Sequence, residues 1–102
     1  MKNTIITDQL EFEFEGIGFV LRGEASPWDN TSDHIIFAEL YLNNKFVEKA
    51  ALPTNFTTGR SELFWKFQLP HNKYRVKVKI LNPSDQYYVS VTDVVVYDVN
   101  NY

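Results

Sequence analysis

Apolar and charged side chains alternate along two stretches of this chain. Residues 10–15, Leu-Glu-Phe-Glu-Phe-Glu, and residues 75–80, Arg-Val-Lys-Val-Lys-Ile, are apolar at every second position. A period of two gives a β-strand one buried face, whereas it gives a helix no continuous apolar side. We therefore predict two half-buried strands whose apolar side chains face a core.

Further strands are predicted from the same alternation and from runs of β-branched and aromatic residues. We expect them at residues 4–6, 17–23, 35–42, 46–52, 63–67, 87–91 and 94–97. The longest polar segments between them, 24–34 and 53–60, are predicted to be loops. Short strands separated by turn signals, with no helical pattern, predict an all-β fold, an antiparallel sandwich of two sheets.

Two connections have the residues of tight turns. The segment 69–72, Leu-Pro-His-Asn, combines proline with asparagine, and both are turn formers. We expect it to join strands 63–67 and 75–80 into a hairpin. Gly16 predicts a second hairpin at the end of residues 10–15.

Four single positions add detail. Asn43 and Asn44 predict a two-residue turn with positive φ. Gly18, inside a strand, predicts a bulge or a close approach of another backbone. Trp65 lies in the middle of a strand and is expected in the core.

Composition and charge fit a single domain and exclude several classes of protein. We treat residues 1–102 as one domain, with a lead-in at 1–9 and a tail at 99–102. The net charge of −3 disfavours nucleic-acid binding, and the absence of cysteine excludes disulfides and thiolate metal sites. No apolar run approaches the about 20 residues of a membrane span, and the N-terminus lacks the apolar run of a signal peptide.

No group of residues predicts catalysis. His34 and His71 lie at strand–turn boundaries with no nearby carboxylate at the spacing of a shared ligand site, so we expect exposed loop histidines. The glutamates of residues 10–15 form a solvated face that the cations of residues 75–80 could match on a neighbouring strand. Neither a G-x-S-x-G turn nor a glycine-rich loop before a helix is present. We expect a protein without enzymatic activity.

The polar loop at 24–34 has the side chains best suited to binding. An exposed indole ring stacks on the apolar face of a sugar, while carboxylate, amide and guanidinium groups bond its hydroxyls. We predict a carbohydrate site with Trp28 as the stacking platform. Its predicted hydroxyl partners are Asp29, Asn30 and Arg60. The alternative is that Trp28 folds back as a lid over one end of the core.

The same loop contains oxygen ligands suited to calcium. These ligands are Asp29, Asn30, Ser32 and Asp33. Their spacing matches no EF-hand loop, and the bidentate glutamate of such loops is missing. We expect an ordinary polar loop and no cofactor. Asp29 and Asp33 are the candidate ligands if calcium does bind.

Four segments resemble galactose-binding-like jelly-roll domains. In chain order they are FEFEGIGFVLRG, AELYLNNKFVEKAALP, RSELFWKFQLPHNKYRVKVKILNP and DVVVYD. More narrowly, they resemble C-terminal accessory domains of glycan-processing proteins of gut Bacteroidetes, some of which carry an ADP-ribosylglycohydrolase-like region. The chain departs from the family pattern at residues 43–44, where the family has Asp-Gly, and at residues 72–74, where it has Gly-x-His.

This resemblance covers Phe12 to Asp98 and rests on structural residues. It implies a jelly-roll fold that binds ligands at the loops of one sandwich end. It also implies a periplasmic or extracellular location if the chain belongs to a secreted glycan-processing protein.

Two functions fit these observations. A carbohydrate-binding accessory module would present a concave aromatic cluster at the loop end. A structural domain that packs against a neighbouring catalytic domain would present a flat aromatic patch on a sheet face, larger than a monomer normally exposes. Tyr41, Tyr88 and Tyr97 are candidates for such a patch.

Overall fold

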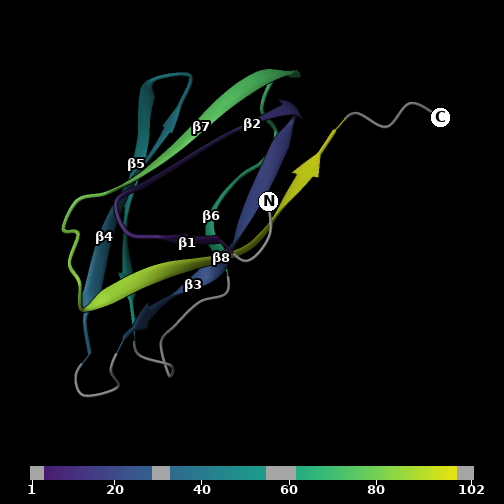
Figure 1. Cartoon of the computed structure of the whole chain (residues 1–102). Helices are drawn as coiled ribbons and strands as arrows, with labels where there is room; N and C mark the ends of the chain where they lie inside the picture. The colour runs from purple at the N-terminus through teal and green to yellow at the C-terminus, as the bar shows by residue number, and fades with distance from the viewer. Residues whose placement is uncertain (1–3, 29–32, 55–61, 99–102) are drawn as a thin grey trace.

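The computed structural model describes residues 4–28, 33–54 and 62–98. These residues contain eight strands and no helix: β1 Thr4–Ile6, β2 Gln9–Gly16, β3 Gly18–Pro27, β4 Ile35–Leu42, β5 Lys45–Pro53, β6 Glu62–Lys66, β7 Asn72–Ile80 and β8 Tyr87–Tyr97. They form a first sheet in the order β1-β8-β3-β6 and a second sheet in the order β2-β7-β4-β5 (Figure 1). All neighbours are antiparallel. The predicted two-sheet antiparallel sandwich is confirmed.

Alternate side chains of both sheets meet in one core. Val76 and Val78 of β7 are buried, as the period of two predicts. Phe14 of β2 stacks on Tyr74 of β7, with ring centroids 5.2 Å apart, and lies 5.4 Å from the ring of Phe19 in β3. These rings join the two sheets, and burial of each side chain of this size stabilises the fold by ~1.5–3 kcal/mol.

The outer face of the second sheet carries the predicted match of opposite charges. β2 pairs with β7 so that Glu11 lies opposite Lys77 and Glu13 lies opposite Arg75. The Arg75 guanidinium is 3.1 Å from the Glu13 carboxylate. Exposed pairs of this kind contribute ~0–1 kcal/mol each, so their main effect is to keep this face polar.

Both predicted hairpins are wrong. β6 pairs with β3, whereas β7 pairs with β2 and β4, so the chain crosses between the sheets at residues 67–71. The step from β2 to β3 at Ile17 crosses in the same way. Leu69 donates its backbone N–H to the Ile17 carbonyl, which ties the two crossings together. Proline, asparagine and glycine mark a chain reversal, but they do not determine whether the next strand joins the same sheet.

The third strand is longer than predicted. β3 continues to Pro27, inside the segment expected to be a loop, because it pairs with β8 from Gly18 opposite Tyr97 to Pro27 opposite Tyr87. Figure 1 shows the two strands running side by side. The backbone N–H and C=O groups of this polar segment find hydrogen-bond partners on β8, so the segment forms a strand without an apolar pattern of its own.

One bulge explains why β8 was predicted as two strands. The register shifts where Arg22 lies opposite Asp93 and Gly23 lies opposite Val91, which leaves Thr92 as an extra residue in β8. An extra residue reverses the side to which the following side chains point. Val89 and Val91 therefore face the core and are buried, whereas beyond the bulge the odd-numbered residues face outward.

Two of the single-residue predictions are confirmed. Asn43 and Asn44 have φ values of 51° and 67°. The Asn43 side-chain oxygen also accepts a hydrogen bond of 2.8 Å from the backbone N–H of Arg75, which connects the turn to β7. A Cβ added to Gly18 would lie 2.6 Å from the carbonyl oxygen of Lys66, so another backbone does approach closely there.

The bulge can be tested by deletion. Removing Thr92 shifts the register by one residue and would turn one half of β8 inside out, so we expect loss of cooperative folding. The matched control is Thr92→Ala, which keeps the extra residue and should stay within about 0.5 kcal/mol of wild type. Urea unfolding followed by circular dichroism measures both variants. A deletion variant as stable as Thr92→Ala would contradict the assigned register.

The two turn asparagines should respond differently to glycine. Asn44→Gly should change the free energy of unfolding by less than about 0.5 kcal/mol, because glycine adopts positive φ freely. Asn43→Gly should lower it by about 1 kcal/mol, because the side-chain acceptor for Arg75 is lost. Chemical denaturation measures both changes, and equal effects would show that the Asn43 hydrogen bond contributes nothing.

Candidate binding site on the outer face of the first sheet

The outer face of the first sheet carries aromatic side chains at both ends and charged side chains between them. We call it the aromatic face. At the end where β3 runs into the segment 29–32, Trp28 and Tyr88 form the loop-end pair. At the opposite end, Trp65, Phe67 and Tyr97 form the far cluster. Strand pairing puts Trp65, Tyr88 and Tyr97 on this face, and ring contacts put Trp28 beside Tyr88 and Phe67 beside Tyr97. The five residues come from four separate parts of the sequence.

The rings of the loop-end pair are in contact, with Trp28 exposed and Tyr88 half-buried. Trp28 is 56% exposed, and its ring lies 4.1 Å from that of Tyr88 at an interplanar angle of 35°. Tyr88 is held there because it lies opposite Ser26 in the β3–β8 ladder. Trp28 donates its backbone N–H to the Gln86 carbonyl. Trp28 is therefore outside the core, and the predicted lid over the core is not found.

The far cluster surrounds Gly18. Trp65 is 40% exposed, Phe67 53% and Tyr97 45%. The Phe67 and Tyr97 rings meet edge to face at 5.4 Å. Gly18 lies opposite Tyr97, and a Cβ added to it would lie 2.6 Å from the Lys66 carbonyl oxygen and 3.2 Å from the Phe67 Cα, so the neighbouring backbone leaves no room for a side chain there.

The expectation that Trp65 lies in the core is wrong. Trp65 lies opposite Val20 on the outer face, and Val20 is only 4% exposed. The neighbours Leu63 and Phe64 are both buried, because the register of the β3–β6 pairing shifts at this point of β6. Three consecutive apolar residues give no alternation, so the sequence alone does not indicate which of them faces outward.

A polar hollow lies between the two aromatic groups. It has a volume of about 330 Å³ and is lined by Arg22, Gly23, Glu24 and Thr92, at the bulge of β8. The Arg22 guanidinium makes two hydrogen bonds to Asp93, of 2.6 and 2.7 Å. These bonds and the charge of Asp93 raise the pKa of Arg22, so Arg22 stays charged and fixed.

The structure does not describe the three residues predicted to bind sugar hydroxyls. Asp29, Asn30 and Arg60 lie outside the described residues. On one described side of each loop, His34 and Thr54 lie together at one end of the sandwich. His34 donates its backbone N–H to the Thr54 hydroxyl at 2.9 Å, and Thr54 donates its own to the His34 carbonyl.

The tyrosines named as patch candidates divide between the two sheets. Tyr88 and Tyr97 lie on the aromatic face, one in each group. Tyr41 lies on the second sheet, with the Lys77 ammonium 5.3 Å from its ring centroid. Tyr41 donates a hydrogen bond to Glu39, and this bond is the main cause of a raised pKa of the Tyr41 phenol.

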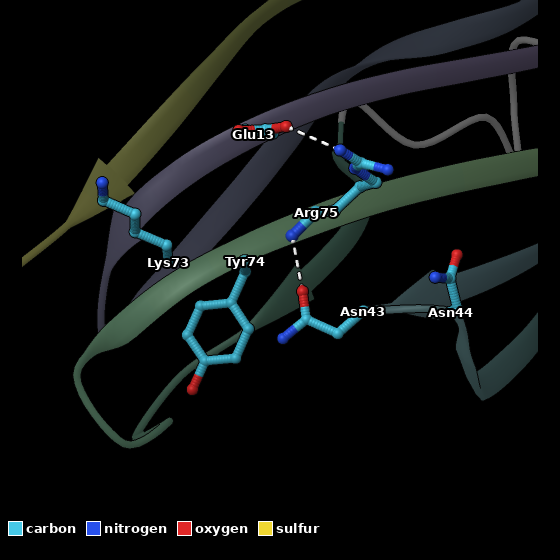
Figure 2. A pocket seen from close by; sticks show the side chains of 6 residues that line it. All are labelled: Glu13, Asn43, Asn44, Lys73, Tyr74 and Arg75. Atoms are coloured by element: carbon cyan, nitrogen blue, oxygen red, sulfur yellow. Dashed lines mark hydrogen bonds and ion pairs between the residues drawn. The ribbon is translucent and has the colours of Figure 1, made fainter.

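The outer side of the second sheet also contains a hollow. It measures about 270 Å³ and is lined by Glu13, Asn43, Asn44, Lys73, Tyr74 and Arg75. Figure 2 shows Arg75 bonded to two other lining residues, through its guanidinium to Glu13 and through its backbone to Asn43. The one aromatic ring of this hollow belongs to Tyr74, which is buried. The hollow therefore offers no exposed stacking platform.

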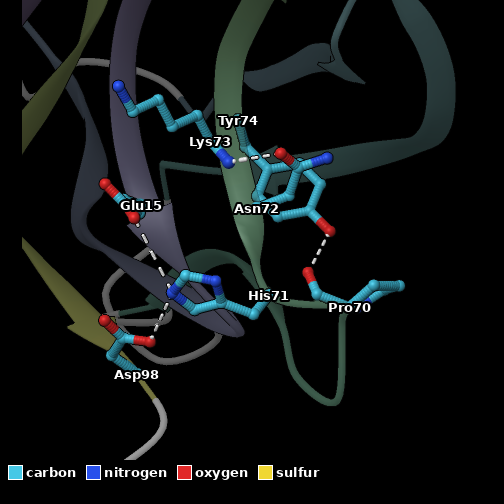
Figure 3. A network of polar contacts seen from close by, with 7 residues as sticks. All are labelled: Glu15, Pro70, His71, Asn72, Lys73, Tyr74 and Asp98. Carbon is cyan, nitrogen blue, oxygen red and sulfur yellow. Dashed lines mark hydrogen bonds and ion pairs between the residues drawn. The ribbon is translucent and has the colours of Figure 1, made fainter.

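His71 is exposed, as predicted, and it has two carboxylate partners that are distant in sequence. The fold brings its Nε2 to 3.1 Å from Asp98 and 3.8 Å from Glu15 (Figure 3). These contacts connect the end of β8, next to Tyr97, to the end of β2. His34 is half-buried rather than exposed, and its ring lies 5.2 Å from that of Tyr87. Within residues 4–28, 33–54 and 62–98, no three histidine, aspartate or glutamate side chains are grouped as metal ligands.

Comparisons with known proteins add no relatives. No family model, no curated protein and no solved structure matches this chain. The likeness to galactose-binding-like domains therefore stays a prediction. In the part of the chain that the structure describes, no helix is long and apolar enough to cross a membrane.

Exposure of both tryptophans can be measured by fluorescence quenching. Trp28→Phe and Trp65→Phe each leave a single indole. We expect acrylamide to quench both variants in the folded state, and to quench Trp28 more strongly than Trp65 because Trp28 is 56% exposed and Trp65 is 40% exposed. The unfolded protein in urea gives the upper limit of quenching. Weak quenching of Trp65 by acrylamide would show that this side chain lies in the core.

Proposed function

We propose that this protein is a non-catalytic accessory module that binds carbohydrate at the loop-end pair. One observation carries the proposal: the exposed Trp28 and the half-buried Tyr88 form an aromatic pair at the end of the sandwich where β3 and β5 end. The galactose-binding-like domains that the chain resembles bind their ligands at such an end.

Aromatic rings suit sugars because the C–H groups of a pyranose form an apolar face while its hydroxyls remain polar. The Trp28 ring rests against Tyr88, and its backbone is bonded to Gln86. A ring that is already fixed loses little conformational freedom when a ligand binds, which favours affinity. Asp29, Asn30 and Arg60 remain the proposed hydroxyl partners.

The strand pairing supports the finer assignment to a jelly roll. β1 pairs with β8, β2 with β7, β3 with β6 and β4 with β5. This is the pairing of one long eight-stranded hairpin rolled into two four-stranded sheets, as in jelly-roll proteins.

Docking onto a neighbouring catalytic domain is the second candidate. The far cluster favours it, because its residues lie on a sheet face rather than at the loop end of the sandwich. From their exposed fractions, the three rings present roughly 300 Å². A typical monomer exposes an apolar patch of about 300–600 Å², and a stable interface buries about 800 Å² per partner. The far cluster is thus no larger than a monomer tolerates, so we rank docking second.

Substitution of Trp28 tests the proposal. The purified protein is screened on an array of plant and host glycans, in calcium and in chelator. Trp28→Ala should weaken binding to any recognised glycan at least about tenfold, because the stacking platform is lost. The melting temperature should stay within about 2 °C of wild type, because an exposed side chain contributes little to stability.

Phe46→Ala is the matched control for this substitution. Phe46 is also 56% exposed, but it lies in β5 of the second sheet. The substitution Phe46→Ala should leave glycan binding unchanged. If Trp28→Ala instead lowers the melting temperature and keeps the affinity, Trp28 has a structural role. Binding that needs calcium would identify Asp29 and Asp33 as candidate ligands.

A further inference from the structure

The two aromatic groups lie along one line on the aromatic face. Trp65 lies opposite Val20 of β3, and Trp28 follows the end of the same strand. The eight residue steps from 20 to 28 span roughly 26 Å in an extended strand. A monosaccharide or disaccharide cannot reach both groups, whereas a chain of several sugar units can.

The surface between the two groups is polar, and its charges are partly compensated. Arg22 and Asp93 neutralise each other through their two hydrogen bonds. The residues that line the hollow beside them carry a carboxylate on Glu24, a hydroxyl on Thr92 and a guanidinium on Arg22. These groups include donors and acceptors, as sugar hydroxyls require. Hydroxyls are neutral, so a ligand that bears them needs no opposite charge to bind there.

The size and order of these features favour a polysaccharide over a protein partner. A protein interface has an apolar centre with a polar rim and buries about 800 Å² on each side. The aromatic face has the opposite order, with two small apolar platforms on either side of a polar centre. A linear polysaccharide matches it, because sugar rings along the chain can stack on the platforms while hydroxyls between them meet the hollow.

We infer that the aromatic face binds one extended chain of a neutral linear polysaccharide, with the far cluster as a second stacking platform. Trp65, opposite Val20, is the ring of this cluster nearer Arg22, and the Phe67 and Tyr97 rings meet beside Gly18. This inference rests on carbohydrate binding at the loop-end pair and adds the class of ligand. Two platforms on one ligand chain make the second contact intramolecular, so affinity for the polymer should exceed that for short fragments by about 10² or more.

Affinity electrophoresis tests the inference in native gels that contain mixed-linkage β-glucan, xylan, galactomannan, pectic galactan or starch. Fragments of two and three sugar units from the retarding polymer are then titrated by calorimetry. Wild type, Trp28→Ala, Trp65→Ala and the control Phe46→Ala are compared. Trp65→Ala should weaken polymer binding at least about tenfold while fragment binding stays at the wild-type value. Trp28→Ala should weaken both, and Phe46→Ala neither.

Trp65→Phe separates loss of the platform from loss of structure, because it keeps an aromatic ring over Val20. It should recover most of the polymer affinity that Trp65→Ala loses, at a wild-type melting temperature. If Trp28→Ala abolishes binding but Trp65→Ala leaves polymer affinity unchanged, the proposed function stands and the second platform is refuted. Protein docking then becomes the better explanation of the far cluster. If no polymer or fragment binds wild type, both the proposed function and this inference fail.

Discussion

The ladder between β3 and β8, with its bulge at Thr92, is the constraint on which the rest of the structure depends. Side chains alternate with period two, so a slip of one residue turns every side chain of a strand to the other face. The extra residue lets Val89 and Val91 fill the core on one side of the bulge. It also lets Tyr88 and Tyr97, on opposite sides of the bulge, reach the same outer face.

The parts of the fold that follow from local chemistry could be predicted from the sequence. Alternation in residues 10–15 and 75–80 gave the correct buried faces, and the charges left over are paired across β2 and β7. The turn at Asn43 required only that asparagine tolerates positive φ. The two crossings between sheets were missed, because a turn signal marks a reversal and carries no information about the sheet that the next strand joins.

The candidate site was only partly predictable for the same reason. Trp28 is conspicuous because it is the one large aromatic residue in the polar segment 24–34, and it is exposed. Its contact with Tyr88 depends on a pairing between strands 60 positions apart (88 − 28). Trp65 lies in an apolar run without alternation, and only the pairing with Val20 places it on the outer face. The aromatic face is thus a product of strand register, and its use for binding needs a direct measurement.

The most direct measurement uses the two indole N–H signals, which belong to Trp28 and Trp65, in a ¹H–¹⁵N correlation spectrum. The spectrum is recorded during titration with a water-soluble fraction of the polysaccharide that retards the protein in gels. Our account predicts that both indole signals shift together, and that backbone signals of β3 and β8 near Arg22 and Thr92 shift with them. Shifts confined to the second sheet around Glu13 and Arg75, with both indole signals unmoved, would contradict it.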